Sequence, residues 1–120
     1  MVQSFLPRPE VVFFRSESGR EPVRDWLRAL EPEARQRIGE DILKVQFGWP
    51  VGMPLVRSLG DRIWEVRSQF RNGGARVLFI CERGKMILLH GFLKKSRATP
   101  KKELELARWR AVEVRQGGLF

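Results

Sequence analysis

The sequence predicts a single α+β domain with a mostly antiparallel sheet of four to five strands, an N-terminal helical hairpin on one face and a C-terminal helix. Three observations support this prediction. Segments of strand and helix periodicity follow one another as one strand, two helices, four strands and one helix. The four later strands lie close together between residues 55 and 93. The 120 residues are 42% hydrophobic, enough for one core, so residues 1–120 are expected to form one domain.

The first 50 residues supply the first strand and the helical hairpin. EVVFFR at 10–15 is β-branched and aromatic and is followed by the turn residues SESG, which indicates a strand. Pro22 suits the first turn of a helix, and apolar residues at helical spacing follow it: Val23, Trp26, Leu27 and Leu30. A second helix begins after Pro32 and ends at Gly48 and Pro50. Its apolar face consists of Ala34, Ile38, Ile42 and Val45.

From Pro54 the pattern changes to strands. LVRSL at 55–59 is one candidate, and IWEVRSQFR at 63–71 alternates in character. Trp64, Val66, Ser68 and Phe70 form its packing face, and the other face, which we expect to present cations, holds Glu65, Arg67, Gln69 and Arg71. The residues Asn72-Gly73-Gly74 predict a hairpin turn into ARVLFICE at 75–82. Cys81 in that apolar run is interpreted as a small hydrophobic residue rather than a nucleophile.

The stretch KMILLHGFLKK at 85–95 is the most informative strand. Its first half is apolar on both faces, which predicts an interior strand that leaves the core near Gly91. Strict alternation would place His90 on the same side as Leu88 and Phe92. The exposed end then delivers the only histidine, an aromatic ring and two lysines to one place. Such a composition suits a phosphate-rich ligand.

The last helix follows Thr99-Pro100, where Thr99 is expected to cap the helix and Pro100 to occupy its first position. Its apolar side consists of Leu104, Ala107, Ala111 and Val114. One cysteine excludes an intramolecular disulfide, and no apolar run approaches the roughly 20 residues of a membrane span. No signal-peptide pattern is visible at the N-terminus either. We therefore expect a cytoplasmic protein with no membrane partner.

The positive charge is concentrated in one segment. The formal net charge is +9, and residues 57–102 contain twelve Lys and Arg residues against three Asp and Glu residues. The segments before and after are neutral. This distribution predicts an anion-binding surface built from the central segment, with nucleic acid as the first candidate partner.

Several kinds of site are excluded by residue type. A zinc site needs three or four suitable ligands, whereas the chain has one Cys and one His. A two-metal nuclease needs clustered carboxylates, and residues 57–102 contain only three. No glycine-rich phosphate loop or Ser-His-Asp arrangement is present. We expect no metal and no cofactor, so any phosphodiester chemistry would be metal-free.

Metal-free cleavage of RNA is feasible with the residues present. The ribose 2′-hydroxyl attacks the adjacent phosphate when a base removes its proton and cations stabilise the added negative charge. Histidine exchanges protons near neutral pH, so His90 is the candidate acid or base, and neighbouring cations would favour its neutral, base-competent form. The candidate cations are Arg67, Arg76, Lys94 and Lys95. Residues expected to contact RNA are Arg57, Arg71, Phe92, Arg97, Lys101 and Lys102.

Structural alternatives exist for these residues. His90 could instead be a histidine satisfied by backbone groups, and Arg76 could form a buried ion pair with Glu65 or Glu82. Lys101 and Lys102 fit a solvated or phosphate-positioning role better than a catalytic one.

Five fragments together resemble a known family. They are EPVRDWL at 21–27, IWEVR at 63–67, ARVLF at 75–79, LLHGFLKK at 88–95 and TPKKELELA at 99–107. In this order and spacing, which covers nearly the whole chain, they resemble the phage-derived, HigB-like branch of the RelE/ParE toxin superfamily.

The resemblance implies a RelE-like fold and a toxin of a type II toxin–antitoxin system. It also implies a metal-independent endoribonuclease that cuts mRNA on the ribosome and blocks translation. A cognate antitoxin, of helix-turn-helix type, would silence it. Carried over to matching positions, the resemblance points to Arg67, Arg76, His90, Lys94 and Lys95 as the catalytic residues.

The chain departs from the family pattern in having no tyrosine. Ala75, Phe79 and Phe92 stand where relatives place tyrosines, which puts more of the proton transfer on His90. Two other functions stay open: a ParE-like toxin that binds DNA gyrase without RNase activity, and a basic protein that binds nucleic acid without chemistry.

Overall fold

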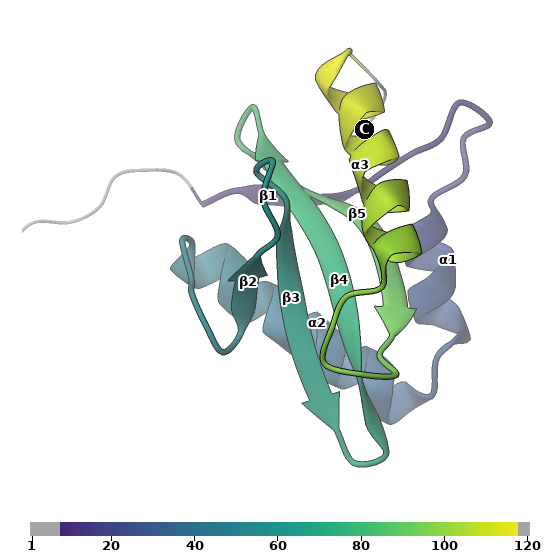
Figure 1. Cartoon of the computed structure of the whole chain (residues 1–120), viewed down its shortest axis with the longest axis vertical. Helices are drawn as coiled ribbons and strands as arrows, with labels where there is room; N and C mark the ends of the chain where they lie inside the picture. Colours follow the sequence, from purple (N-terminus) through teal and green to yellow (C-terminus); the bar gives the residue numbers. More distant parts are fainter. Residues whose placement is uncertain (1–7, 118–120) are drawn as a thin grey trace, which may run out of the picture.

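The computed structural model describes residues 8–117, which contain five strands and three helices (Figure 1). The strands are β1 (Glu10–Phe13), β2 (Val56–Ser58), β3 (Trp64–Phe70), β4 (Gly73–Glu82) and β5 (Lys85–Leu93). The helices are α1 (Pro22–Ala29), α2 (Pro32–Gly48) and α3 (Lys101–Arg115). The element order is the predicted one, although the first strand is two residues shorter than EVVFFR.

All five strands form one sheet in the order β1-β5-β4-β3-β2. The strands β2 to β5 pair antiparallel, whereas β1 pairs parallel to β5. The helical hairpin carries the chain from β1 at one edge of the sheet to β2 at the other. β5 therefore lies between two neighbours, as its apolar character on both faces predicted. The mostly antiparallel α+β fold is confirmed.

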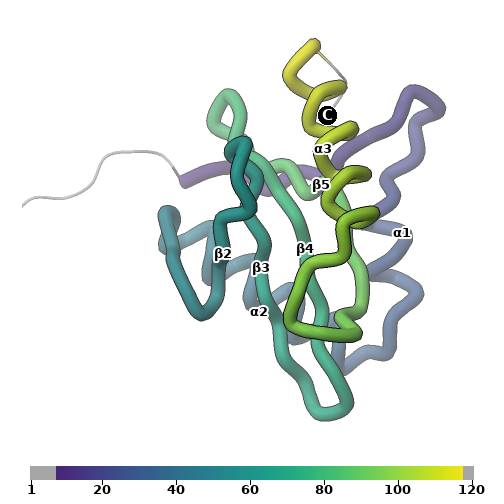
Figure 2. Tube along the Cα trace, in the orientation of Figure 1, coloured from purple at the N-terminus to yellow at the C-terminus, as the bar shows by residue number. Residues whose placement is uncertain are grey.

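Helices cover both faces of the sheet (Figure 1 and Figure 2). The helical hairpin lies behind the sheet, with α2 on β3 and α1 on β5, and α3 lies in front on β4 and β5. A separate apolar core fills each side: one contains Val23, Ile38 and Val45 of the hairpin, the other Ala107 and Val114 of α3. Within residues 8–117, no helix combines the length and apolar character needed to cross a membrane.

α3 covers only part of the front face. In front of the lower part of β4 lies the segment 94–100, which joins β5 to α3 (Figure 1).

Burial raises the pKa of the Cys81 thiol to about 11, and the charge of Glu82 adds to the shift. Only a small fraction of such a thiol is ionised at neutral pH, which fits a packing role.

A β-bulge in β5 changes which face its last residues occupy. Leu78 of β4 pairs with His90, and its neighbour Phe79 pairs with Leu88, so Leu89 has no partner of its own. Up to the bulge, Leu88 packs on the hairpin side; beyond it, Phe92 packs on the α3 side. The predicted alternation, with His90 on the side of Leu88, was therefore wrong, because strict period two does not survive one extra residue.

Trp26 of α1 makes the glycine at position 91 necessary. A Cβ at Gly91 would overlap with the indole ring of Trp26. We expect Gly91→Ala to destabilise the fold by about 1–3 kcal/mol in a denaturant titration, because the ring or the strand must shift. Gly39→Ala is the matched control: a Cβ there meets nothing within 4 Å, so this change inside α2 should stabilise by roughly 0.5–1 kcal/mol. Equal effects of the two variants would contradict the close packing of Trp26 on β5.

Candidate functional site

The register of the sheet brings most predicted site residues together on the α3 side. One row across the strands contains Arg57, Glu65, Leu78 and His90. The next row contains Arg67, Arg76 and Phe92. Lys94 extends over Gly74, because a Cβ on that glycine would lie 3.0 Å from the Lys94 Cε. The residues of these two rows and Lys94 therefore lie on the face opposite the helical hairpin.

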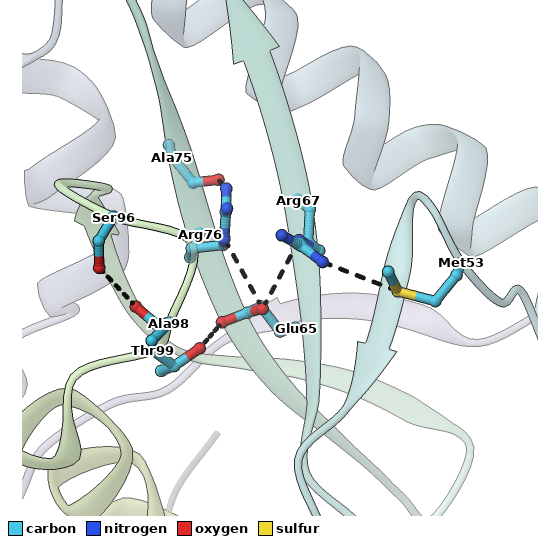
Figure 3. Close-up of polar contacts among 8 residues, drawn as sticks. All are labelled: Met53, Glu65, Arg67, Ala75, Arg76, Ser96, Ala98 and Thr99. Atoms are coloured by element: carbon cyan, nitrogen blue, oxygen red, sulfur yellow. Dashed lines mark hydrogen bonds and ion pairs between the residues drawn. The ribbon is translucent and has the colours of Figure 1, made fainter.

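Glu65 lies at the centre of this arrangement (Figure 3). Its side chain is fully buried. The Oε1 atom is 3.7 Å from Arg76 Nε and 3.9 Å from Arg67 Nε, and Oε2 accepts a short hydrogen bond from the Thr99 hydroxyl. Glu65 is buried although its face of the strand was expected to present cations, because Thr99 and the segment that contains it fold over the carboxylate. The sequence of β3 alone does not indicate that the segment 94–100 covers Glu65.

Thr99 does not cap α3 as predicted. The helix begins at Lys101, and Pro100 occupies the capping position without a side-chain hydrogen bond. The Thr99 hydroxyl is instead used by Glu65. A threonine before a helix is ambiguous in sequence, since its hydroxyl can serve the helix or a tertiary partner.

Arg76 is buried with only 2% of its surface exposed. Its Nη1 donates a hydrogen bond of 3.1 Å to the Ala75 carbonyl, and its Nε faces Glu65. Burial lowers the pKa of Arg76, the charge of Arg67 lowers it further, and Glu65 opposes the change. Of the alternatives set out for Arg76, the structure contains the buried ion pair with Glu65.

Arg67 is the more accessible arginine of the pair, with 19% of its side chain exposed. Its Nη1 is 3.8 Å from the Met53 sulfur. It also lines a cleft of about 380 Å³ at the edge of the sheet, where β2 has ended and α2 approaches β3. The lining residues are Arg37, Asp41, Lys44, Pro54, Leu55, Arg67 and Gln69.

Sequence reasoning missed the α2 residues of this cleft. Arg37 and Lys44 belong to the neutral first half of the chain, and only the packing of α2 on β3 brings them beside Arg67. The buried carboxylate of Asp41 faces both: its Oδ2 is 3.4 Å from Arg37 Nε and its Oδ1 is 3.8 Å from Lys44 Nζ. The cleft therefore has three cations for one carboxylate.

His90 is bonded to side chains rather than to the backbone. Its Nε2 is 2.7 Å from Glu103 Oε1, and its Nδ1 is 3.5 Å from Arg110 Nη1. The ring stacks on Phe92 with 5.7 Å between ring centroids. A guanidinium can only donate, so Nδ1 acts as acceptor and a neutral ring carries its proton on Nε2, toward Glu103. We had expected cations around His90, but its closest partner is a carboxylate that follows 13 residues later.

Exposed cations surround these residues. In the described part of the chain, the exposed cations without an ion pair near the site are Arg57, Lys95, Arg97 and Lys102. Arg71 forms no ion pair either, but it lines a pocket with Glu33, Gln36 and Glu40 of α2, so the structure does not place this predicted RNA-binding residue with the others. Arg71 lies in the β3–β4 turn, which is formed by Arg71 and Asn72, one position earlier than predicted. Lys101 lies 3.9 Å from Glu105. Uncompensated cations of this kind are the groups that contact a phosphate backbone.

Among residues 8–117, no three His, Cys, Asp or Glu side chains gather as a metal site would require.

Comparison with protein families matches residues 25–112 to the model of phage-derived Gp49-like proteins (DUF891). A search of curated proteins gave no match. The matched segment begins inside α1 and ends inside α3, so it includes the whole β2 to β5 meander and the residues described above. The Gp49-like family is associated with RelE- and HigB-type toxins, which is compatible with a toxin that has an antitoxin partner. Because the match covers more than two thirds of the chain, the protein belongs to the Gp49-like family of phage-derived proteins.

Proposed function

We propose that this protein is the toxin of a type II toxin–antitoxin system and acts as a metal-independent endoribonuclease on mRNA in the ribosome. The observation that carries the proposal is the gathering of Arg67, His90 and Lys94 on one face of the sheet, with exposed cations around them. The attack of a 2′-hydroxyl on a phosphate requires an acid–base group and cations that stabilise the added negative charge. Here His90 is the acid–base group, and Arg67 and Lys94 are the cations.

In the proposed mechanism, the scissile phosphate binds over Arg67 at the end of the sheet. Arg67 offers donors to the phosphate oxygens, while Arg76 adds positive charge from the interior. As the 2′-oxygen bonds to phosphorus, the added negative charge develops beside these two guanidinium groups. The bond to the 5′-oxygen then breaks and this oxygen takes up a proton from water, which leaves a 2′,3′-cyclic phosphate and a free 5′-hydroxyl.

His90 transfers the proton in this proposal. Glu103 accepts the Nε2 hydrogen bond and so keeps the proton on that nitrogen, which leaves Nδ1 as the basic atom. The Arg110 contact to Nδ1 is long at 3.5 Å, and Arg110 bonds the Leu89 carbonyl more closely at 2.8 Å. The 2′-hydroxyl would take the place of the long contact.

The same basic surface is the basis for proposing an antitoxin partner. A toxin with this many uncompensated cations has to be neutralised while the cell grows, so we propose a partner with an acidic or helix-turn-helix-linked segment that covers residues 57–102. Co-expression with the neighbouring reading frame is the direct check, since rescue of growth requires that the partner blocks the toxin.

The cleavage reaction tests the proposed function. When the protein is added to ribosomes that translate a defined mRNA, we expect mRNA fragments that end in a 2′,3′-cyclic or 3′-phosphate. Cleavage should persist in EDTA. Affinity for the ribosome should fall by about 10³-fold between about 50 and 200 mM salt if roughly six phosphates are contacted. Loss of cleavage in EDTA would overturn the metal-free mechanism. Binding to gyrase with a flat salt dependence and no cleavage would replace the proposal with a ParE-like function.

A further inference from the structure

We propose that Glu65 is a positioning residue of this site, which fixes the two arginines and the lysine-rich segment relative to one another. The proposal rests on the proposed function, since the arginines are those assigned to the phosphate. The proposal adds to that function a role in catalysis for Glu65, which is a buried anion at a site that binds anions.

The burial of Glu65 requires an explanation. An ionised carboxylate that is withdrawn from water is costly unless cations and hydrogen bonds compensate it. Here Oε2 has one short hydrogen bond from Thr99, whereas Oε1 has no hydrogen bond and only two cations at 3.7 and 3.9 Å. The carboxylate is thus equidistant, within a few tenths of an ångström, from two guanidinium groups on neighbouring strands.

This geometry orients the arginines. Arg67 and Arg76 are register partners, so their side chains leave adjacent strands on the same face. Two guanidinium groups in such a position repel each other, and the pKa of Arg76 is lowered by its burial and then by Arg67. A buried anion between their Nε atoms holds both stems and leaves the terminal nitrogens of Arg67 directed elsewhere, as its contact with Met53 shows (Figure 3). Glu65 therefore sets where the exposed end of Arg67 lies.

Thr99 extends the same control to the segment 94–100. This segment carries Lys94, Lys95 and Arg97, and its last part is tied to the sheet by the Thr99 hydroxyl on Glu65 Oε2. At its start, the Lys94 amide donates to the Gly74 carbonyl at 2.9 Å. One carboxylate thus connects the arginines of β3 and β4 with the loop that supplies the lysines.

Glu65→Gln separates positioning from binding. The variant keeps the shape and a hydrogen-bond acceptor for Thr99 but removes the charge between the arginines. We expect the single-turnover rate constant for ribosome-dependent cleavage at saturating protein to fall by at least about tenfold, as misplaced groups do. The half-saturating concentration should stay equal or decrease, because a negative charge has been removed beside the phosphates. A merely structural residue would not lower the rate while binding is kept.

Two further variants complete the test. Glu105→Gln removes a carboxylate beside Lys101, outside the cluster, and should leave the saturated rate constant unchanged. Thr99→Val keeps every charge and removes only the hydroxyl, so it should lower the saturated rate by about threefold or more even if Glu65→Gln fails to fold. A wild-type or higher rate in folded Glu65→Gln, or a wild-type rate in Thr99→Val where Glu65→Gln does not fold, overturns the role of Glu65. Absence of cleavage by the wild-type protein overturns the proposed function itself.

Discussion

Arg67→Gln is expected to lower the rate constant for mRNA cleavage by about 10²-fold while the melting temperature stays close to that of the wild type. Loss of a donor to the developing charge of a transition state typically costs this much. The fold should tolerate the change, because Arg67 is partly exposed and its contacts are a 3.9 Å ion pair and a 3.8 Å contact with sulfur. The measurement is single-turnover cleavage on programmed ribosomes, with thermal unfolding measured on the same preparation.

Arg76→Gln is the informative comparison. Arg76 is buried and is the nearer cation to Glu65, so its loss leaves a buried carboxylate with less compensation. Removal of one partner from a buried ion pair costs about 3–5 kcal/mol, so this variant should lose stability as well as activity. The sequence assigned both arginines to the site and gave only Arg76 the alternative of a buried ion pair, which is the contact that the structure contains. If Arg67→Gln cleaves mRNA at the wild-type rate, the role of Arg67 is contradicted, and Lys94 and Lys95 are the cations that stabilise the developing charge.

The helices, the strands and their order were predictable because periodicity and turn residues are local properties. The antiparallel meander, the interior position of β5 and the position of the hairpin followed from the apolar residues of each segment. Arg67 and Arg76 share one face because they are partners across a hairpin whose turn residues are visible in the sequence.

The rest depends on contacts between distant segments. Nothing in LLHGFLKK marks Leu89 as an extra residue, because a bulge forms when two strands pair and not within one strand. Glu65 belongs to the strand face that was expected to present cations, and Thr99 was expected to cap the helix that follows it, yet the two side chains bond to each other. Their hydrogen bond joins residues 34 positions apart. The α2 cations Arg37 and Lys44 were missed for the same reason, since charge counted along the chain does not report proximity in the fold.

His90→Gln is the second variant with a large expected effect. Glutamine can keep a hydrogen bond to Glu103 and so retain the connection between β5 and α3, but it cannot accept and release a proton. Loss of general acid–base catalysis typically lowers a rate by about 10² to 10⁴-fold, and we expect a decrease in this range at saturating protein. A pH–rate profile of both proteins is the second measurement, because proton transfer by the imidazole makes the rate depend on pH and glutamine cannot contribute such a dependence.

The position of His90 between Glu103 and Arg110 makes the control essential, because the same contacts would serve a residue that only fastens α3 to the sheet. Glu103→Gln removes the charge beside the ring and keeps an acceptor for Nε2. If His90 transfers the proton, His90→Gln should be much slower than Glu103→Gln, because only the first removes the base, and both should melt at similar temperatures. If His90 only fastens α3, both variants should melt earlier and cleave at the wild-type rate per folded molecule. That second result would assign the proton transfer to Lys94 or Lys95, the remaining groups beside the proposed phosphate position that can exchange a proton.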